Sequence, residues 1–125
     1  MQKIALAVSL AALALAAPAA HAAPAADKVV LVVKYVASPG REEEVAARFA
    51  KLAQVVAREE PGTTFIVYRS EKEPGAFVFY EVYGSRADFE RHRDVVLARF
   101  RKDNPAPEGL FAGPPRVETL RELPR

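Results

Sequence analysis

Two side chains in the second half of the sequence are suited to acid–base chemistry. Glu81 lies in the aromatic and β-branched run Ala76-Phe-Val-Phe-Tyr-Glu-Val-Tyr83, where a carboxylate is costly to bury unless it is paired, hydrogen-bonded or shifted in pKa. His92 follows in the next element, and an imidazole gains and loses a proton near neutral pH. Structural roles are also open to both residues. Glu81 could meet a Lys or Arg of a neighbouring strand or reach water at the sheet edge, and His92 could be bonded to a backbone carbonyl or to Glu81.

The elements that hold these two residues are a strand and the helix after it. The hydrophobic spacing changes from two to about 3.6 after Tyr83, which predicts a strand that ends there and a helix from about Arg86 to Lys102. Ser85 stands at the change. Its hydroxyl can accept a hydrogen bond from the backbone N–H of Asp88, whose carboxylate can complete a capping box.

The remaining pattern predicts the element order βαββαβ, an α+β ferredoxin-like arrangement. The expected strands are Val29–Val36, Thr63–Ser70, Phe77–Tyr83 and Arg116–Leu123, and a further helix begins near Glu42 and ends before Pro61-Gly62. Right-handed crossovers would place both helices on one face of the sheet. The first strand is apolar at almost every position, so its second face needs a cover that one short chain cannot supply. We therefore expect a homodimer through the bare sheet face.

Each helix and the third strand present distinct apolar sets. The first helix is expected to pack Val45, Phe49, Leu52, Ala53 and Val56 on the sheet, and the second to pack Phe89, Val96 and Phe100, with His92 and Val95 near the edge of that stripe. On the third strand, Val78, Tyr80 and Val82 would face one side, and Phe77, Phe79, Glu81 and Tyr83 the other.

The N-terminal stretch is typical of a secretory signal peptide. Lys3 precedes the apolar run Ile4–Ala17, and Ala20 and Ala22 frame a cleavage site, with Ala25 marking a second choice. We expect a signal peptide at residues 1–22, a flexible leader at 23–27 and one domain at 28–125. The mature protein would be exported, either periplasmic or secreted, with no membrane attachment after cleavage.

Composition excludes several classes of site. The net charge is +2 and falls by one when Lys3 is removed, so nucleic acid is not an expected partner. The chain has no cysteine, which excludes disulfides, thiolate metal sites and cysteine nucleophiles. Glu42, Glu43 and Glu44 fit the first turn of a helix, where the dipole favours acids, and we expect no metal there.

Three stretches resemble the antibiotic biosynthesis monooxygenase family, in the branch that includes small quinol monooxygenases. They are Glu60-Pro-Gly-Thr-Thr-Phe-Ile-Val-Tyr-Arg-Ser70, Glu73-Pro-Gly-Ala-Phe-Val-Phe-Tyr-Glu-Val-Tyr83 and Ala87-Asp-Phe-Glu-Arg-His92. The resemblance covers nearly all of the chain after the expected signal peptide. It implies a dimeric α/β barrel of two ferredoxin-like sheets, with a pocket in each subunit between the sheet and the helices.

The resemblance also implies a chemistry. Members that are enzymes oxidise electron-rich phenols or quinols with O₂ and use neither metal nor flavin, so we expect no cofactor. His92 matches the family motif and is the expected catalytic residue. The side chains expected to contact a small aromatic substrate are Tyr35, Tyr68, Glu81, Tyr83, Phe89 and Phe111. Tyr80 could also orient a phenolic ring.

Other readings remain open at the level of sequence. The same fold could serve as a non-catalytic dimeric module that binds a small apolar ligand, or as an interaction dimer without a ligand. Leu110 and Phe111 could pack on the core or form one lip of a pocket. Lys34, Arg69 and Glu81 could serve that pocket or pair with one another.

Overall fold

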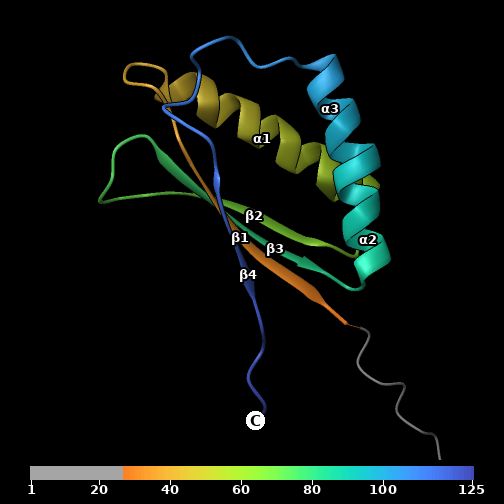
Figure 1. Cartoon of the computed structure of the whole chain (residues 1–125). Coiled ribbons are helices and arrows are strands. Elements are labelled where there is room, and N and C mark those ends of the chain that lie inside the picture. The colour runs from red at the N-terminus through yellow and green to blue at the C-terminus, as the bar shows by residue number, and fades with distance from the viewer. Residues whose placement is uncertain (1–26) are drawn as a thin grey trace, which may run out of the picture.

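The computed structural model describes residues 27–125, which form a four-stranded antiparallel sheet with its helices on one face (Figure 1). The expected signal peptide and nearly all of the expected leader lie outside the described residues. No helix within residues 27–125 is long and apolar enough to cross a membrane.

The sheet has the strand order β2-β3-β1-β4, so the α+β ferredoxin-like fold is confirmed. The elements are β1 (Val29–Val36), α1 (Glu42–Glu59), β2 (Thr64–Arg69), β3 (Ala76–Tyr83), α2 (Arg86–Arg91), the π-helix η1 (His92–Leu97), α3 (Ala98–Asp103) and β4 (Arg116–Leu120). The central pair is β1 and β3, and β4 is an edge strand, as its polar composition predicts.

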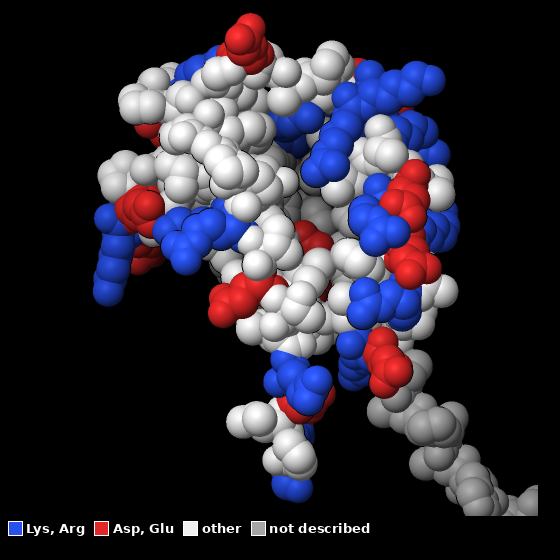
Figure 2. Space-filling model, viewed as in Figure 1, with Lys and Arg blue, Asp and Glu red and all other residues white. Residues whose placement is uncertain are grey.

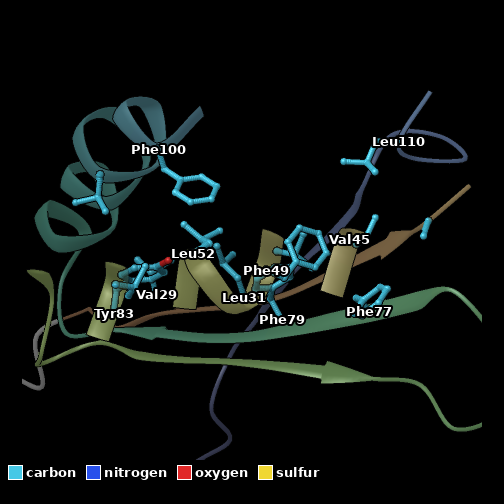
Figure 3. Packing of buried hydrophobic residues seen from close by; sticks show 14 residues of the cluster. Val29, Leu31, Val45, Phe49, Leu52, Phe77, Phe79, Tyr83, Phe100 and Leu110 are labelled. Atoms are coloured by element: carbon cyan, nitrogen blue, oxygen red, sulfur yellow. The ribbon is translucent and has the colours of Figure 1, made fainter. Parts of the chain in front are cut away.

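The two faces of β3 differ as its alternation predicts. Phe77, Phe79, Glu81 and Tyr83 are buried beneath the helices, whereas Val78, Tyr80 and Val82 are half-buried or exposed on the other face. The core lies between the sheet and the helices, where Phe49 and Leu52 of α1 lie above Leu31 of β1 and Phe79 of β3 (Figure 3). Most members of the first predicted stripe are buried, but Ala53 lies only at its margin.

The second helical region runs without a break from Arg86 to Asp103, but its middle third is a π-helix. Ser85 caps it as predicted: its Oγ accepts from the backbone N–H of Asp88 at 3.1 Å and also bonds Oδ2 of Asp88 at 2.8 Å. The expectation that His92 lies at the edge of the stripe is wrong, because His92 is only 3 % exposed. The wider turns of a π-helix rotate side chains away from the 3.6-residue pattern, and Val95 is correspondingly exposed.

Candidate functional site

A cavity of about 630 Å³ lies between the helices and the covered face of the sheet. Its floor is formed by inward residues of β1 and β3, and its walls by α1, by the region from α2 to α3, and by the segment that connects α3 to β4. Figure 2 shows the surface hollowed here, with acidic atoms inside the hollow and basic side chains at its edge. The wall is largely apolar, so the few polar groups that reach it are candidates for chemistry.

The first polar feature is a buried histidine–carboxylate pair. Nδ1 of His92 lies 2.7 Å from Oε2 of Glu60, and both side chains are almost entirely buried. Glu60 follows the last turn of α1, and its backbone N–H bonds the carbonyl of Val56. His92 is the first residue of η1, so the pair joins the ends of two elements that are remote in the sequence.

The pair determines which ring nitrogen can act on a ligand. Within residues 27–125, every buried side-chain nitrogen and oxygen has a hydrogen-bond partner, and Nδ1 of His92 uses Glu60. Nε2 makes no hydrogen bond with the described residues, and His92 lines the cavity, so Nε2 is the ring nitrogen left free to bind a ligand there. A carboxylate that accepts from Nδ1–H selects the tautomer with a free lone pair on Nε2, which is the form required of a general base.

The second polar feature is a carboxyl–phenol pair beside the first. The hydroxyl of Tyr83 donates to Oε2 of Glu81 at 2.6 Å, and Glu81 lines the cavity. Burial raises the pKa of Glu81, and the hydrogen bond from Tyr83 opposes part of that rise. Burial and the neighbouring Glu81 carboxyl also raise the pKa of Tyr83, so this phenol keeps its proton. The ring of Tyr83 lies 5.1 Å from that of His92, between centroids, and helps to fix the imidazole.

An aromatic wall occupies the middle of the cavity. Tyr35, Phe49, Phe79 and Phe111 contact one another with ring centroids 4.6 to 5.8 Å apart. Phe65 continues this wall to the imidazole, with its centroid 5.3 Å from that of His92. Such a surface fits the face or edge of a flat aromatic ligand whose reacting group would lie near Nε2.

The structure brings most of the predicted site residues together. His92, Tyr35, Glu81, Phe89 and Phe111 all line the cavity. Leu110 is instead part of the core, so the two apolar residues of that loop have different roles.

Two of the predicted substrate contacts need correction. Tyr83 is fully buried behind Glu81 and His92 and does not reach the cavity. Tyr68 is 54 % exposed on the helix-free face, because it pairs with the outward-facing Val78 in the β2–β3 register. Tyr68 is therefore removed from the candidate site, and Tyr83 supports Glu81 from behind.

The structure decides between the alternatives left open for the strand charges and for His92. Lys34 pairs with Glu73, and Arg69 pairs with Glu43 at 2.7 Å, so neither meets Glu81. Neither Glu81 nor a backbone carbonyl accepts from Nδ1 of His92, since Glu60 occupies that position.

Glu60 is the functional candidate that sequence reasoning missed. Because Glu60 directly precedes Pro61-Gly62, the sequence predicts only the end of a helix at this position. One signal was available: an acidic residue at a helix C-terminus is opposed by the helix dipole, so a buried partner has to compensate. In the structure, that partner is His92, and Nη1 of Arg91 lies 3.7 Å from the second carboxylate oxygen.

Comparisons with known proteins agree with this architecture. The family model described as antibiotic biosynthesis monooxygenase matches residues 28–96, which include both members of each polar pair. The fold is similar to that of PA3566 from Pseudomonas aeruginosa, with 21% identity, a TM-score of 0.67, and coverage of 82% of this chain and 100% of that chain. It is also similar to SO0527 from Shewanella oneidensis, with 26% identity, a TM-score of 0.63, and coverage of 74% of this chain and 88% of the other. No curated protein matches the chain in sequence.

Proposed function

The chain belongs to the antibiotic biosynthesis monooxygenase family, and from this premise we propose that it is a monooxygenase that oxidises a quinol-like or other phenolic small molecule with O₂. The observation that carries the proposal is the His92–Glu60 pair, which presents Nε2 at the end of an aromatic-walled cavity. A base inside an apolar cavity is what the activation of a phenol toward O₂ requires.

In the proposed reaction, Nε2 of His92 removes the proton whose loss makes the substrate an electron-rich anion. Glu60 stabilises the imidazolium that forms, because its carboxylate already accepts from Nδ1–H. The anion transfers electrons to O₂, a C–O bond forms at the activated carbon, and the resulting peroxide anion takes the proton back from the imidazolium to give a hydroperoxide. For an anthrone, the resulting hydroperoxide loses water, so that one oxygen atom ends in the new carbonyl and the other in H₂O. The substrate supplies all the electrons, and the reaction as proposed needs no metal or flavin.

Aerobic turnover by the mature chain tests this function. We expect the wild type to consume O₂ with at least one member of a panel of reduced quinols and anthrones, and His92→Gln to lower kcat by roughly 10²- to 10⁴-fold. Gln can still donate to Glu60, which protects the fold. Tyr68→Phe serves as a control outside the cavity and should leave turnover unchanged.

Binding of the corresponding quinones should be measured alongside turnover, because the two measurements together distinguish an enzyme from a non-catalytic binding module. Unaltered turnover by His92→Gln would overturn the catalytic assignment. Binding without turnover in the wild type would favour a non-catalytic module that uses the same cavity for a small apolar ligand.

We also propose that two copies associate through the helix-free face of the sheet. Ile66, Tyr68, Tyr80 and Leu120 are exposed large apolar side chains on this face, and half-buried valines of β1 and β3 lie between them. Large contiguous apolar faces of this kind mark association surfaces, and a C2 pair would cover the same patch on both copies.

Export is the last part of the proposal, supported only by the pattern of residues 1–22. Cleavage after Ala22 would give a mature N-terminus at Ala23, in the periplasm or outside the cell. Mass spectrometry of the protein recovered from the periplasmic and culture fractions of an expressing bacterium would test both the site and the location. An intact Met1 in the cytoplasmic fraction would overturn it.

A further inference from the structure

Three arginines in the described part of the chain line the cavity: Arg48, Arg93 and Arg101. Arg93 is neutralised by Asp94, to which it makes two hydrogen bonds of 2.6 and 2.8 Å. Arg48 and Arg101 form no ion pair with any acid in the described part of the chain. An apolar cavity therefore has two uncompensated positive charges at its mouth.

Arg48 is held in place but keeps most of its donors free. Its Nη1 donates to the backbone carbonyl of Asn104 at 2.6 Å, and its guanidinium lies over the ring of Phe100, 5.2 Å from the centroid. A guanidinium has five N–H donors, so this contact uses only one of them. Partial burial and the nearby charge of Arg101 lower the pKa of Arg48. A neighbouring anion would raise the pKa of Arg48 and so oppose both effects.

The two arginines and the His92–Glu60 pair are attached to the helices at well-separated positions. Arg48 and Glu60 lie on α1 and just beyond its end, about 18 Å apart along the axis at the helical rise of about 1.5 Å per residue. His92 is the first residue of η1, and Arg101 lies nine residues later, in α3. The aromatic wall of Tyr35, Phe49, Phe79 and Phe111 lines the same cavity.

We infer that the substrate is an anionic aromatic compound, with a carboxylate or similar group bound by Arg48 and Arg101 at the mouth while the ring to be oxidised lies near His92. Arginine is suited to this task because its planar donors match a carboxylate in a bidentate geometry. The inference deepens the proposed function and takes the same cavity as the substrate site. It adds the charge and the orientation of the ligand.

Equilibrium binding of a matched ligand pair tests the inference without turnover. The probes are an anthraquinone carboxylate and its primary amide, which have the same rings and differ in charge. We expect the wild type to bind the carboxylate at least about tenfold more tightly than the amide, the scale of one hydrogen bond to a charged group. In the double variant Arg48→Gln/Arg101→Gln, we expect this preference to vanish while the affinity for the amide stays the same.

Two further variants control for folding and for overall charge. Arg48→Lys controls for folding, because lysine keeps both a positive charge and a donor for the Asn104 carbonyl. It should retain part of the preference for the carboxylate. Lys102→Gln removes a positive charge from the exposed side of α3, beside Arg101, and should leave the preference intact. Equal binding of the two ligands by the wild type, or a preference that survives in the double variant, would overturn the inference. Either result could occur with quinol turnover intact, so the failure of the inference is distinct from failure of the proposed function.

Discussion

Oε2 of Glu60 lies 2.7 Å from Nδ1 of His92, although 32 positions separate the two residues in the sequence. Glu60 follows the last residue of α1, and His92 is the first residue of η1, so the packing of these two helices brings the pair together. The second carboxylate oxygen lies 3.7 Å from Nη1 of Arg91, which partly balances the buried charge. Glu60 does not line the cavity, and any effect it has on a ligand acts through the imidazole. It is therefore a positioning residue.

Glu60→Gln should lower kcat by about ten- to a hundredfold, the usual effect of removing a carboxylate that orients a functional histidine. The amide can bond Nδ1 in either orientation, so the tautomer with a free Nε2 is no longer selected. The affinity for the quinone product should change little, because Glu60 does not touch the ligand. Steady-state kcat and KM, with a quinone binding constant, would check the prediction.

Glu59→Gln is the matched control for this variant. Glu59 is the adjacent carboxylate, and it pairs with Arg99 at the surface. Its loss should leave kcat unchanged. Equal effects of the two substitutions, or a Glu60→Gln effect on KM alone, would contradict a positioning role.

The contrast between Glu60 and Glu81 shows where sequence reasoning succeeds. Glu81 stands in an alternating apolar strand, so its burial and its inward direction follow from a period of two. The face of Tyr68 could have been predicted in the same way: the Glu73-Pro-Gly75 turn makes β2 and β3 a hairpin, and Tyr68 then shares the outer face with Val78. Local rules determine these positions.

Glu60 and His92 mark where those rules end. The helical pattern places His92 near an edge because it assumes 3.6 residues per turn, whereas η1 has wider turns. The partner of His92 depends on how the end of α1 meets the start of η1, and no spacing in the sequence encodes that distance. The two free arginines were missed for a related reason, since charged residues on helices usually face solvent.

The buried pair should also contribute to stability in a coupled manner. His92→Ala leaves the Glu60 carboxylate buried without its partner, and we expect a loss of about 3 to 5 kcal/mol in the free energy of unfolding. Glu60→Ala/His92→Ala removes both groups and should cost less than the sum of the two single variants, with a coupling of about 1 to 3 kcal/mol. Urea denaturation of the four proteins would measure it. Additive losses would show that the contact contributes nothing beyond the packing of each side chain.

Glu81 should give the protein a pH dependence that Glu81→Gln removes. Burial raises its pKa in the folded state above the ordinary value of 4.5, so the folded state holds this proton more tightly than the unfolded state. Its contribution to stability is then fully present below pH 4.5 and is lost as the pH rises through the folded-state pKa. Gln stays neutral and can still accept from Tyr83. We therefore expect Glu81→Gln to gain stability relative to the wild type as the pH rises toward neutrality.

Urea unfolding at a series of pH values between acid and neutral would check this prediction for Glu81. The relevant quantity is the difference between wild type and variant, because it removes the contributions of the other titrating groups. Glu90→Gln, an exposed carboxyl on α2, should give a nearly flat difference. A difference for Glu81→Gln that is flat, or that grows toward acid, would show that the folded protein does not favour the protonated carboxyl.

The helix-free face of the sheet should determine the oligomeric state of the protein in solution. Tyr80 lies on the central strand β3 and points out from that face, so Tyr80→Lys would place an ammonium where the proposed partner buries apolar surface. We expect the mature protein to sediment as a dimer at micromolar concentration and Tyr80→Lys to sediment as a monomer. Glu90→Lys introduces the same residue on the helical side and should remain dimeric. A wild type that stays monomeric at high concentration would contradict the two-copy arrangement, while the cavity, which residues of one chain line, could still bind its ligand.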